Sequence, residues 1–494
     1  MLNQIAGIAT VISAAIFAIF AFRYWKKNES AKALVLIFAC GLVLRIFSGM
    51  DFYLNSWDER YHALAARSLL DHPMTPTLYD DPAIDYNYKD WTNNHIWVHK
   101  PPMTLWVMAA SMKMFGVNEI AARAPSILFS SLGIFLTFFI AKHFFDTKTA
   151  LLASFFHAIN GLLIDLAAGH QPTDHPDTLF FFFLELGIFF SVYYMYRSSM
   201  AVLFLTGVAT GFSVLTKWLP GLLVIALLFF LLIPKEPLKK AALHSFFVFA
   251  VAFIVFIPWQ IYIYSAFPKE AAWESYFNYR HLFEPLEGHD GTVLYHLAMM
   301  PRIFGELIYI PLLLFFYSLY KRNLSADKFV LVLWLALPYI FFSFVATKMP
   351  GYVMMSAPPM FIILSWAFWI ISEERKKPKY RTAKIFLLAL LLVLPIRYSI
   401  ERVKPFENKD RNPGWTKELR KLESTVGSSK AAIFNVEHYI EAMFYAKVSA
   451  YPFIPDQKQI DQAVGRGFKV FIYDDSRIPP EIRNQQNVFL LTHD

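Results

Sequence analysis

Long apolar stretches separated by short polar connections dominate the first 400 positions of the chain. A helix needs roughly 20 apolar residues to cross the hydrocarbon core of a bilayer. About twelve stretches approach this length, at 3–22, 31–50, 121–141, 149–169, 178–196, 200–216, 218–233, 241–260, 301–320, 328–346, 352–371 and 383–400. Only TKWLPG separates the sixth from the seventh, which predicts a hairpin or a broken helix. The pattern predicts an all-α polytopic membrane domain over residues 1–400.

The connection at 51–120 is far longer than the others and contains two further helical patterns. DERYHALAARSLLDH has the spacing of an amphipathic helix, and PPMTLWVMAASMKMFGV is apolar but too short and interrupted to span. We expect both segments to be interfacial helices that lie on the membrane surface.

The pattern changes after about residue 401, where short β-type runs alternate with helical ones. The runs KAAIFNVE, KVSAYPF, FKVFIYDD and NVFLLTHD predict strands, and HYIEAMFYA and PDQKQIDQAV predict helices between them. Residues 401–494 are therefore predicted to form a small α/β domain.

Composition supports the membrane interpretation. The chain is 56% hydrophobic and only 17% charged, whereas soluble domains carry about 25% charged residues. The net charge of +8 comes from basic residues in short connections, which is an orientation signal and not a surface for nucleic acid. The single cysteine, Cys40, excludes an internal disulfide.

The basic connections predict the orientation of the chain. They lie at 23–27, 142–148, 234–240, 320–323 and 373–381. An even number of apolar stretches separates each one from the next, so all five lie on the same side of the membrane. The positive-inside rule makes that side the cytoplasm. The segments 51–120, 170–177, 261–300 and the tail then face outward from the inner (plasma) membrane. The first stretch lacks a charged beginning and a clear cleavage site, so we expect a retained helix.

The outward segments hold an uneven share of ionisable residues. These candidates are Asp58, Glu59, Asn94, His95, His99, Lys100, Asp174, Asp177, His281, His289, Asp290 and Lys348. If the stretches pack as one bundle, these segments meet at one membrane surface. Carboxylates beside cations and imidazoles can deprotonate a nucleophile and neutralise a phosphate leaving group.

Structural alternatives exist for the acidic candidates. An acidic pair at a helix end, as at Asp58, is commonly just solvated. Asp174 and Asp177 favour the dipole of a following helix, and Asp177 directly precedes TLFFFFLELGIFF, where it suits an N-cap. Glu185 lies inside an apolar stretch, where a carboxylate is either functional or a partner in helix packing.

The basic and imidazole candidates also have alternatives. His95 and His99 are four residues apart, a spacing that suits a metal only on a helix, and the prolines that follow argue against one. Lys100 and Lys348 also suit lysines that extend toward the interface. Taken alone, His281 is expected to form structural hydrogen bonds and not to bind a ligand. The sequence therefore leaves open whether the protein binds a divalent metal.

The motifs WDERYHALAARSLL and NHIWVHKPPMTLWVMAASMKMFGVNEIAARAPS resemble the first outer loop of polyprenyl-phosphate-sugar-dependent glycosyltransferases of the GT-C superfamily. That group includes protein O-mannosyltransferases and lipid A aminoarabinose transferases. PDTLFFFF, LTKWLPGLL, IPWQIYI and KMPGYVMMSAPP follow in the family's order. The resemblance covers residues 50–370 and rests on the ordered set, since no single motif is decisive.

The resemblance implies a GT-C fold and an inverting membrane glycosyltransferase. The implied donor is a sugar on undecaprenyl phosphate or a similar lipid, and the acceptor is a lipid, glycan or protein. By position, Asp58 resembles the general base, Glu59 its companion, and Asp177 the second outer-loop carboxylate, with Asp174 as its rival. A lipid monophosphate needs no nucleotide-binding loop, and the sequence has no Walker or GxGxxG motif.

The resemblance also implies ligands for the donor phosphate. Lys100 resembles the lysine that contacts it, and Lys348 and Tyr352 match a late element near it. Arg123 matches a family arginine with a structural or phosphate role. His281 resembles an outer-loop histidine near the active site.

The sequence also departs from the family pattern. Arg60 directly follows Glu59, the surroundings of His281 differ, and two stretches precede the acidic pair instead of one. The acceptor lipid A and the sugar aminoarabinose are therefore not assigned. We expect Arg60 and His62 to account for a difference in substrate from the family. The alternative functions are a flippase of lipid-linked sugars, which predicts repeats and mid-membrane charges, and a sensor with an inert bundle.

Overall fold

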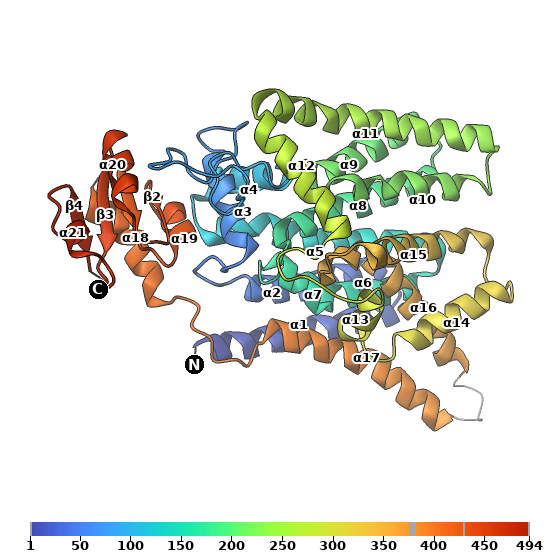
Figure 1. Ribbon diagram of the computed structural model, residues 1–494. Coiled ribbons are helices and arrows are strands. Elements are labelled where there is room, and N and C mark those ends of the chain that lie inside the picture. The colour runs from blue at the N-terminus through green and yellow to red at the C-terminus, as the bar shows by residue number, and fades with distance from the viewer. Residues whose placement is uncertain (1, 375–380, 428–429, 493–494) are drawn as a thin grey trace. The chain divides into compact units, whose positions relative to one another are not determined.

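The computed structural model describes residues 2–374, 381–427 and 430–492, and the chain forms two compact units (Figure 1). The first comprises Met1–Gly49, Ser126–Tyr262 and Tyr276–Lys409. The second comprises Met50–Pro125, Ile263–Ser275 and Asp410–Asp494. Residues 375–380 of the predicted basic connection at 373–381 lie outside the described residues.

The first unit is helical, and α5, α11 and α12 contribute residues to both units. Its elements are α1 (Leu2–Lys26), α2 (Ser30–Ser48), α5 (Glu119–Phe144), α6 (Thr147–Ile159), α7 (Gly161–Ala167), α8 (Asp174–Tyr194), α9 (Met200–Lys217), η1 (Leu219–Leu222), α10 (Leu223–Leu232), α11 (Leu238–Ala266), α12 (Pro268–Phe283), α13 (Tyr295–Phe304), α14 (Tyr309–Tyr320), η2 (Ala326–Lys328), α15 (Phe329–Phe344), η3 (Pro350–Ser356), α16 (Ala357–Glu374) and α17 (Arg381–Val403).

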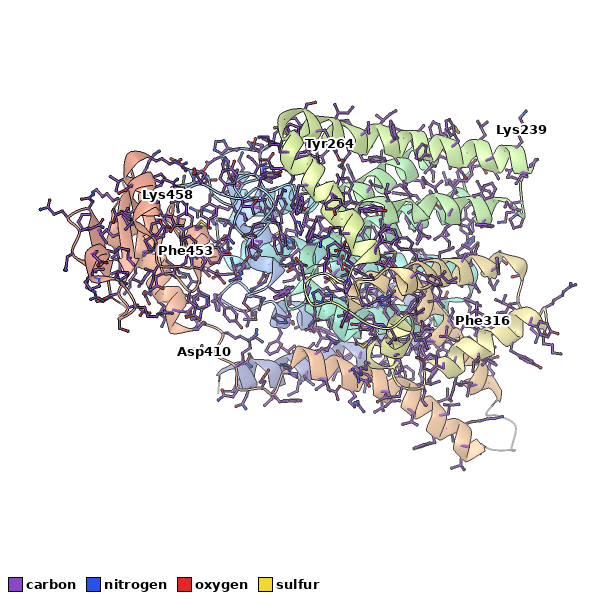
Figure 2. The ribbon with its side chains drawn as sticks, in the orientation of Figure 1. Lys239, Tyr264, Phe316, Asp410, Phe453 and Lys458 are labelled. Atoms are coloured by element: carbon purple, nitrogen blue, oxygen red, sulfur yellow. The ribbon has the colours of Figure 1, made fainter. Side chains whose placement is uncertain are left out.

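Eight helices among the described residues are long and apolar enough to cross a membrane, and ten if each of two bent pairs is one span. Two shorter apolar helices lie at Leu219–Leu232 and Phe329–Phe344. Together these helices coincide with the twelve predicted stretches. Large apolar side chains on them remain exposed, such as Phe316 on α14 (Figure 2) and Ile254 on α11. Such a surface suits hydrocarbon better than water.

Two of the predicted stretches are bent, and a turn separates the sixth stretch from the seventh. The pair α6 and α7 bends by 51° at Asn160, whose side chain accepts a hydrogen bond from the Leu163 amide, 3.1 Å away, and so caps α7. The stretch predicted at 301–320 is also bent, because α13 and α14 meet at 108°. After α9, Trp218 adopts a left-handed φ of 63°. Gly221 then lies against the backbone of α9, so the TKWLPG segment is a turn.

The second unit combines short helices with one sheet. Its helices include α3 (Asp58–Ser68), α4 (Pro102–Phe115), α18 (Gly414–Val426), α19 (Tyr439–Tyr445), α20 (Gln457–Gly465) and α21 (Pro480–Arg483). Its strands are β1 (Ala431–Phe434), β2 (Ser449–Ala450), β3 (Lys469–Tyr473) and β4 (Val488–Leu491). The described strands pair in parallel in the order β2-β1-β3-β4. This confirms the predicted α/β fold of the tail.

The tail and the long loop share one apolar core. It joins Leu64 and Ala66 of α3 and Met108 of α4 to Ile440 of α19 and Ile433 of β1. Helix α3 is buried on almost every side and does not present one apolar face. Its environment thus differs from the interfacial position that the sequence predicted. In the tail, the second unit begins at Asp410 and not at the predicted 401, and it also includes Met50–Pro125 and Ile263–Ser275.

Candidate active site

The first candidate cluster lies in the second unit, where α3 begins at Asp58. Glu59 is fully buried, and its carboxylate accepts a bidentate pair from Arg123, with Nε–Oε1 at 2.6 Å and Nη2–Oε2 at 2.7 Å. Asn55 donates its backbone amide and its side-chain amide to the same carboxylate, at 2.7 and 2.6 Å. Bidentate, charge-assisted bonds of this kind fix geometry strongly. Glu59 therefore anchors the start of α3.

Arg123 is committed to structure in this arrangement. Besides Glu59, its guanidinium donates to the carbonyl oxygens of Asp51 and Tyr53, the latter at 2.6 Å. These bonds occupy at least four of its five N–H groups. Of the two roles that the sequence left open for Arg123, the structural one fits this geometry and phosphate binding does not.

Asp58 differs from its neighbour in position and exposure. It is the first residue of α3 and keeps 8% of its surface exposed. The positive end of the helix dipole favours an ionised carboxylate there. His62 stands one turn later on the same face of α3, buried, with its ring edge-on to Trp97 at 5.8 Å. A carboxylate and an imidazole thus share one helix face.

The segment that carries the predicted histidines is extended and not helical. Nδ1 of His99 lies 2.8 Å from a carboxylate oxygen of the buried Glu274, and the His99 ring stacks on Trp91 at 4.5 Å. Nδ1 of His95 lies 2.5 Å from the carbonyl oxygen of Tyr79. Both histidines therefore hold the loop in place. Within the described ranges, no group of three His, Cys, Asp or Glu side chains is arranged to hold a metal.

Lys100 follows this segment and is half-buried. Among the described residues it has no hydrogen-bond or ion-pair partner, in contrast to most cations of this unit. Its ammonium is therefore available for an anionic ligand. Its predicted role as a ligand of the donor phosphate stays a prediction.

The second candidate cluster lies in the first unit around Asp177. Helix α8 begins at Asp174 with Thr173 as N-cap residue, so Asp177 lies one turn inside the helix and is not its N-cap. Its buried carboxylate forms an ion pair with the ammonium of Lys217, the last residue of α9. Its second oxygen accepts a hydrogen bond from Thr173 Oγ1 at 2.5 Å. The Lys217 ammonium also lies 4.7 Å from the ring centroid of Tyr352.

This cluster brings three of the quoted motifs together. A Cβ on Gly351 would lie 2.8 Å from Oδ2 of Asp177, closer than side chains normally approach. The glycine of KMPGY is thus required for the backbone to pass beside the carboxylate. Sequence reasoning missed Lys217 as a site residue. Its signal was a lone lysine inside the apolar motif LTKWLPGLL, whose partner only the fold identifies.

Lys348 has a different environment from the one predicted. Its buried ammonium donates to the carbonyl oxygens of Phe342, Ser343 and Val345, at 2.9, 2.7 and 2.5 Å. Burial lowers its pKa from the usual lysine value. An ammonium has three N–H groups, so all are used at the C-terminus of α15. The geometry fits a helix cap and leaves no donor for a phosphate.

The remaining candidates make local contacts. Asp174 accepts a hydrogen bond from the backbone amide of His175 in the first turn of α8. Nδ1 of His281 lies 3.0 Å from Thr347 Oγ1, and the Thr347 amide donates to the His281 carbonyl at 3.1 Å. His281 therefore joins the end of α12 to the segment before η3.

Glu185 is enclosed between helices of the first unit. It accepts a hydrogen bond from Thr137 Oγ1 at 2.5 Å, and the same hydroxyl lies 2.8 Å from Nδ1 of His157. Of the two alternatives stated for this carboxylate, a partner in helix packing fits these contacts.

Comparison with known proteins tests the resemblance stated from the motifs. Residues 99–262 match the family model of dolichyl-phosphate-mannose-protein mannosyltransferases. This region is similar to that family. The resemblance that the motifs predicted is thereby confirmed.

Several proteins share similarity over a longer region. An uncharacterized protein of Aquifex aeolicus is 28% identical over 320 residues, covering 62% of this chain and 60% of its own length. The undecaprenyl phosphate-alpha-4-amino-4-deoxy-L-arabinose arabinosyl transferase of Pseudomonas aeruginosa strain UCBPP-PA14 is 24% identical over 353 residues, covering 64% and 60%. The chain thus spans about 60% of the length of these relatives.

Solved structures show the same fold. ArnT from Cupriavidus metallidurans bound to undecaprenyl phosphate superposes with a TM-score of 0.59 at 17% identity, covering 88% of this chain and 87% of ArnT. The oligosaccharyltransferase AglB from Archaeoglobus fulgidus gives 0.62 at 14% identity, covering 87% and 65%. The protein is therefore a mostly helical, multi-span membrane protein of this fold.

Proposed function

We propose that this protein transfers a sugar from a polyprenyl-phosphate donor to a hydroxyl of a lipid, glycan or protein acceptor, with inversion at the anomeric carbon. The observation that carries the proposal is the acidic pair of α3. Glu59 is fixed by Arg123, so Asp58 stands at a defined place at the helix start. The family match and the undecaprenyl phosphate donor in the names of the relatives support the substrate class.

In the proposed reaction, Asp58 acts as the general base. It takes the proton of the acceptor hydroxyl as that oxygen attacks the anomeric carbon. The bond from this carbon to the phosphate oxygen breaks, and its electron pair leaves with the polyprenyl phosphate. Attack opposite the leaving group inverts the anomeric configuration. Glu59 and Arg123 serve as positioning residues.

The leaving phosphate needs a cation, and two candidates are proposed as alternatives. Lys100 is the first, since it has no ionic partner among the described residues. Lys217 is the second, and it replaces Lys348, whose N–H groups cap α15. Asp177 and Tyr352 orient the Lys217 ammonium. Fixed cations stabilise developing phosphate charge without reorganisation.

The proposed topology has twelve passages with both termini outside. The supports are the coincidence of twelve predicted stretches with apolar helices and the basic connections, which all fall on one side of the membrane. We infer that Asp58, Lys100 and the α/β tail are extracytoplasmic, in the inner membrane.

Replacing Asp58 by Asn tests the proposed base. The assay uses purified enzyme in vesicles with undecaprenyl-phosphate-linked aminoarabinose or hexose as donors, and measures release of undecaprenyl phosphate in the presence of a membrane extract that supplies acceptor. We expect a loss of about 10²–10⁴-fold with unchanged thermal stability. The matched control is Asp81→Asn, which changes an exposed carboxylate of the same loop paired with Lys430.

Full transfer by the Asp58→Asn variant would remove Asp58 from the mechanism. Movement of donor across the vesicle bilayer, with no release of undecaprenyl phosphate when acceptor is added, would instead support the flippase alternative.

A further inference from the structure

The imidazole of His99 is held from several sides within the second unit. Its Nδ1 lies 2.8 Å from a carboxylate oxygen of Glu274. The ring stacks on Trp91 with centroids 4.5 Å apart and an interplanar angle of 7°, and Trp97 packs against it at 5.6 Å. His99 and Glu274 are both buried. Two indoles and one hydrogen bond therefore set the position and the orientation of this ring.

The partner of His99 is an unusual residue of its own helix. Helix α12 exposes most of its surface, and of its 16 described residues only two are buried, one of which is Glu274. Burial of a carboxylate is costly unless the group is paired. The neighbouring Trp273 lies 5.2 Å from the ammonium of Lys89, so this end of α12 contacts the long loop at two places. Helix α12 thus brings a buried carboxylate to the residue immediately before Lys100.

The backbone that follows Lys100 is restricted as well. Pro101 comes next, with φ −60° and ψ 155°, and Pro102 is the first residue of α4. A proline ring fixes its own φ and limits the preceding residue to extended backbone. The Cα of Lys100 is therefore held between the fixed His99 ring and the start of a helix. Its ammonium has no hydrogen-bond or ion-pair partner among the described residues. A fixed stem with an available ammonium suits a preorganised ligand for an anion.

We propose that Glu274 is a positioning residue for Lys100, that it acts through His99, and that it thereby places the Lys100 ammonium against the phosphate of the lipid donor. The inference rests on the proposed function, in which Lys100 is a candidate ligand of that phosphate. A misplacement of about 1 Å in a positioned group can cost on the order of 10²-fold in rate. Loss of the acceptor oxygen of Glu274 should therefore weaken phosphate binding, although Glu274 itself contacts no ligand.

Binding of undecaprenyl phosphate to the full-length protein in detergent tests the proposal. Glu274→Met removes the acceptor oxygen at a similar side-chain length and should raise the Kd about tenfold. Glu274→Gln keeps an oxygen at the same reach, so its Kd should stay within about twofold of the unaltered protein. Lys100→Gln should also raise the Kd. Adding Glu274→Met to Lys100→Gln should cause no further loss, because two changes in one chain of contacts are not additive.

A second variant covers the case in which Glu274→Met does not fold. His99→Phe combined with Glu274→Met replaces the buried pair by apolar side chains of similar shape, a change that is often close to neutral for stability. The Phe ring also keeps the stacking surface for Trp91. This double variant should melt like the unaltered protein and bind undecaprenyl phosphate as weakly as Glu274→Met is expected to.

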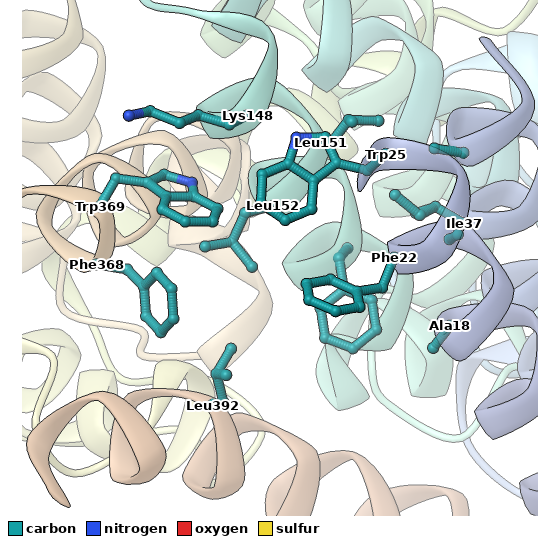
Figure 3. A pocket seen from close by; sticks show the side chains of 13 residues that line it. Ala18, Phe22, Trp25, Ile37, Lys148, Leu151, Leu152, Phe368, Trp369 and Leu392 are labelled. Atoms are coloured by element: carbon teal, nitrogen blue, oxygen red, sulfur yellow. The ribbon is translucent and has the colours of Figure 1, made fainter. Parts of the chain in front are cut away.

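Two controls match these substitutions. Glu270→Gln changes the acidic residue one turn earlier on α12. Lys148→Gln changes a lysine of the first unit that lies at the edge of an apolar cavity of about 230 Å³ (Figure 3) and contacts Glu373 at 2.6 Å. Its ammonium already has a carboxylate partner, unlike that of Lys100. Both control variants should bind undecaprenyl phosphate like the unaltered protein.

Three results would overturn the inference, and they separate it from the proposed function. Unchanged binding in both Glu274→Met and the double variant, with weakened binding in Lys100→Gln, would remove only the role of Glu274. A further loss when Glu274→Met is added to Lys100→Gln would show that Glu274 does not act through Lys100. Unchanged binding in Lys100→Gln would remove Lys100 as the phosphate ligand, and this inference with it.

Discussion

Asp58 and Glu59 are adjacent in the chain, yet their surroundings differ because neighbouring residues of a helix point about 100° apart. Glu59 faces Arg123 and the 51–55 segment and is fully enclosed, whereas Asp58 keeps an exposed edge at the helix start. Side chains with such different environments are expected to respond differently to the same amide substitution.

Glu59→Gln should therefore act on stability. It leaves the buried guanidinium of Arg123 without its counter-ion, which costs about 3–5 kcal/mol. We expect a clear fall in the melting temperature of the detergent-solubilised protein, followed by an intrinsic-fluorescence melt. Asp58→Asn serves as the comparison and should melt like the unaltered protein. Identical melting of both variants would mean that Glu59 does not anchor α3.

Gly351→Ala tests the second cluster, around Asp177, by adding one methyl group beside its carboxylate. The new Cβ would stand 2.8 Å from Asp177 Oδ2 and would displace the carboxylate from Lys217. We expect transfer activity to fall at least tenfold while the protein stays membrane-inserted. Gly414→Ala is the matched control, because no atom lies within 4 Å of a Cβ built there. Activity equal to that of this control would separate Asp177 from the reaction.

At the scale of elements, α3 joins the loop to the tail. Its Tyr61 hydroxyl lies 3.2 Å from that of Tyr439 on α19, and Arg60 lies 3.5 Å from the buried Glu441. Arg67 donates to carbonyl oxygens at the C-terminus of α19, including those of Phe444 at 2.9 Å and Ala446 at 3.1 Å. Arg60, which departs from the family pattern, thus serves this contact. The helix that begins at Asp58 is held by the tail.

Arg67→Gln should loosen that attachment. The cation is lost from the carbonyl end of α19, where its charge and hydrogen bonds are favourable. Hydrogen–deuterium exchange should then quicken in α3 and α19 together, and transfer activity should fall with it. Arg477→Gln, at a side chain that is 74% exposed, should change neither. Faster exchange in α19 alone would show that the tail does not hold α3.

At the scale of the whole molecule, the basic connections set the orientation. Reporter fusions at Asn28 and Asn323 should read as cytoplasmic, and a fusion at Asp290 as outside. Each position lies in a polar connection between helices, so insertion disturbs the apolar segments least. A cytoplasmic reading at Asp290 together with an outer reading at Asn28 would invert the topology and place Asp58 in the cytoplasm.

Much of this architecture follows from local sequence. The apolar stretches, the basic connections and the four strands of the tail are patterns within about 20 neighbouring residues, and hydropathy and charge report them directly. The family motifs that contain Asp58 and Lys100 are also local patterns, so the sequence alone could propose these two residues as candidates. The bends between α6 and α7 and between α13 and α14 were missed, because composition stays apolar through them.

Only the tertiary structure decided which polar groups pair. Arg123 reaches Glu59 across 64 positions of sequence, and Lys217 reaches Asp177 across 40. Lys348 turns to the carbonyl end of α15 instead of facing a ligand. The α/β tail shares a core with a loop more than 300 residues earlier. An isolated lysine or glutamate looks the same in sequence whether it binds a ligand or caps a helix, because its role depends on the atoms that packing brings within hydrogen-bond distance.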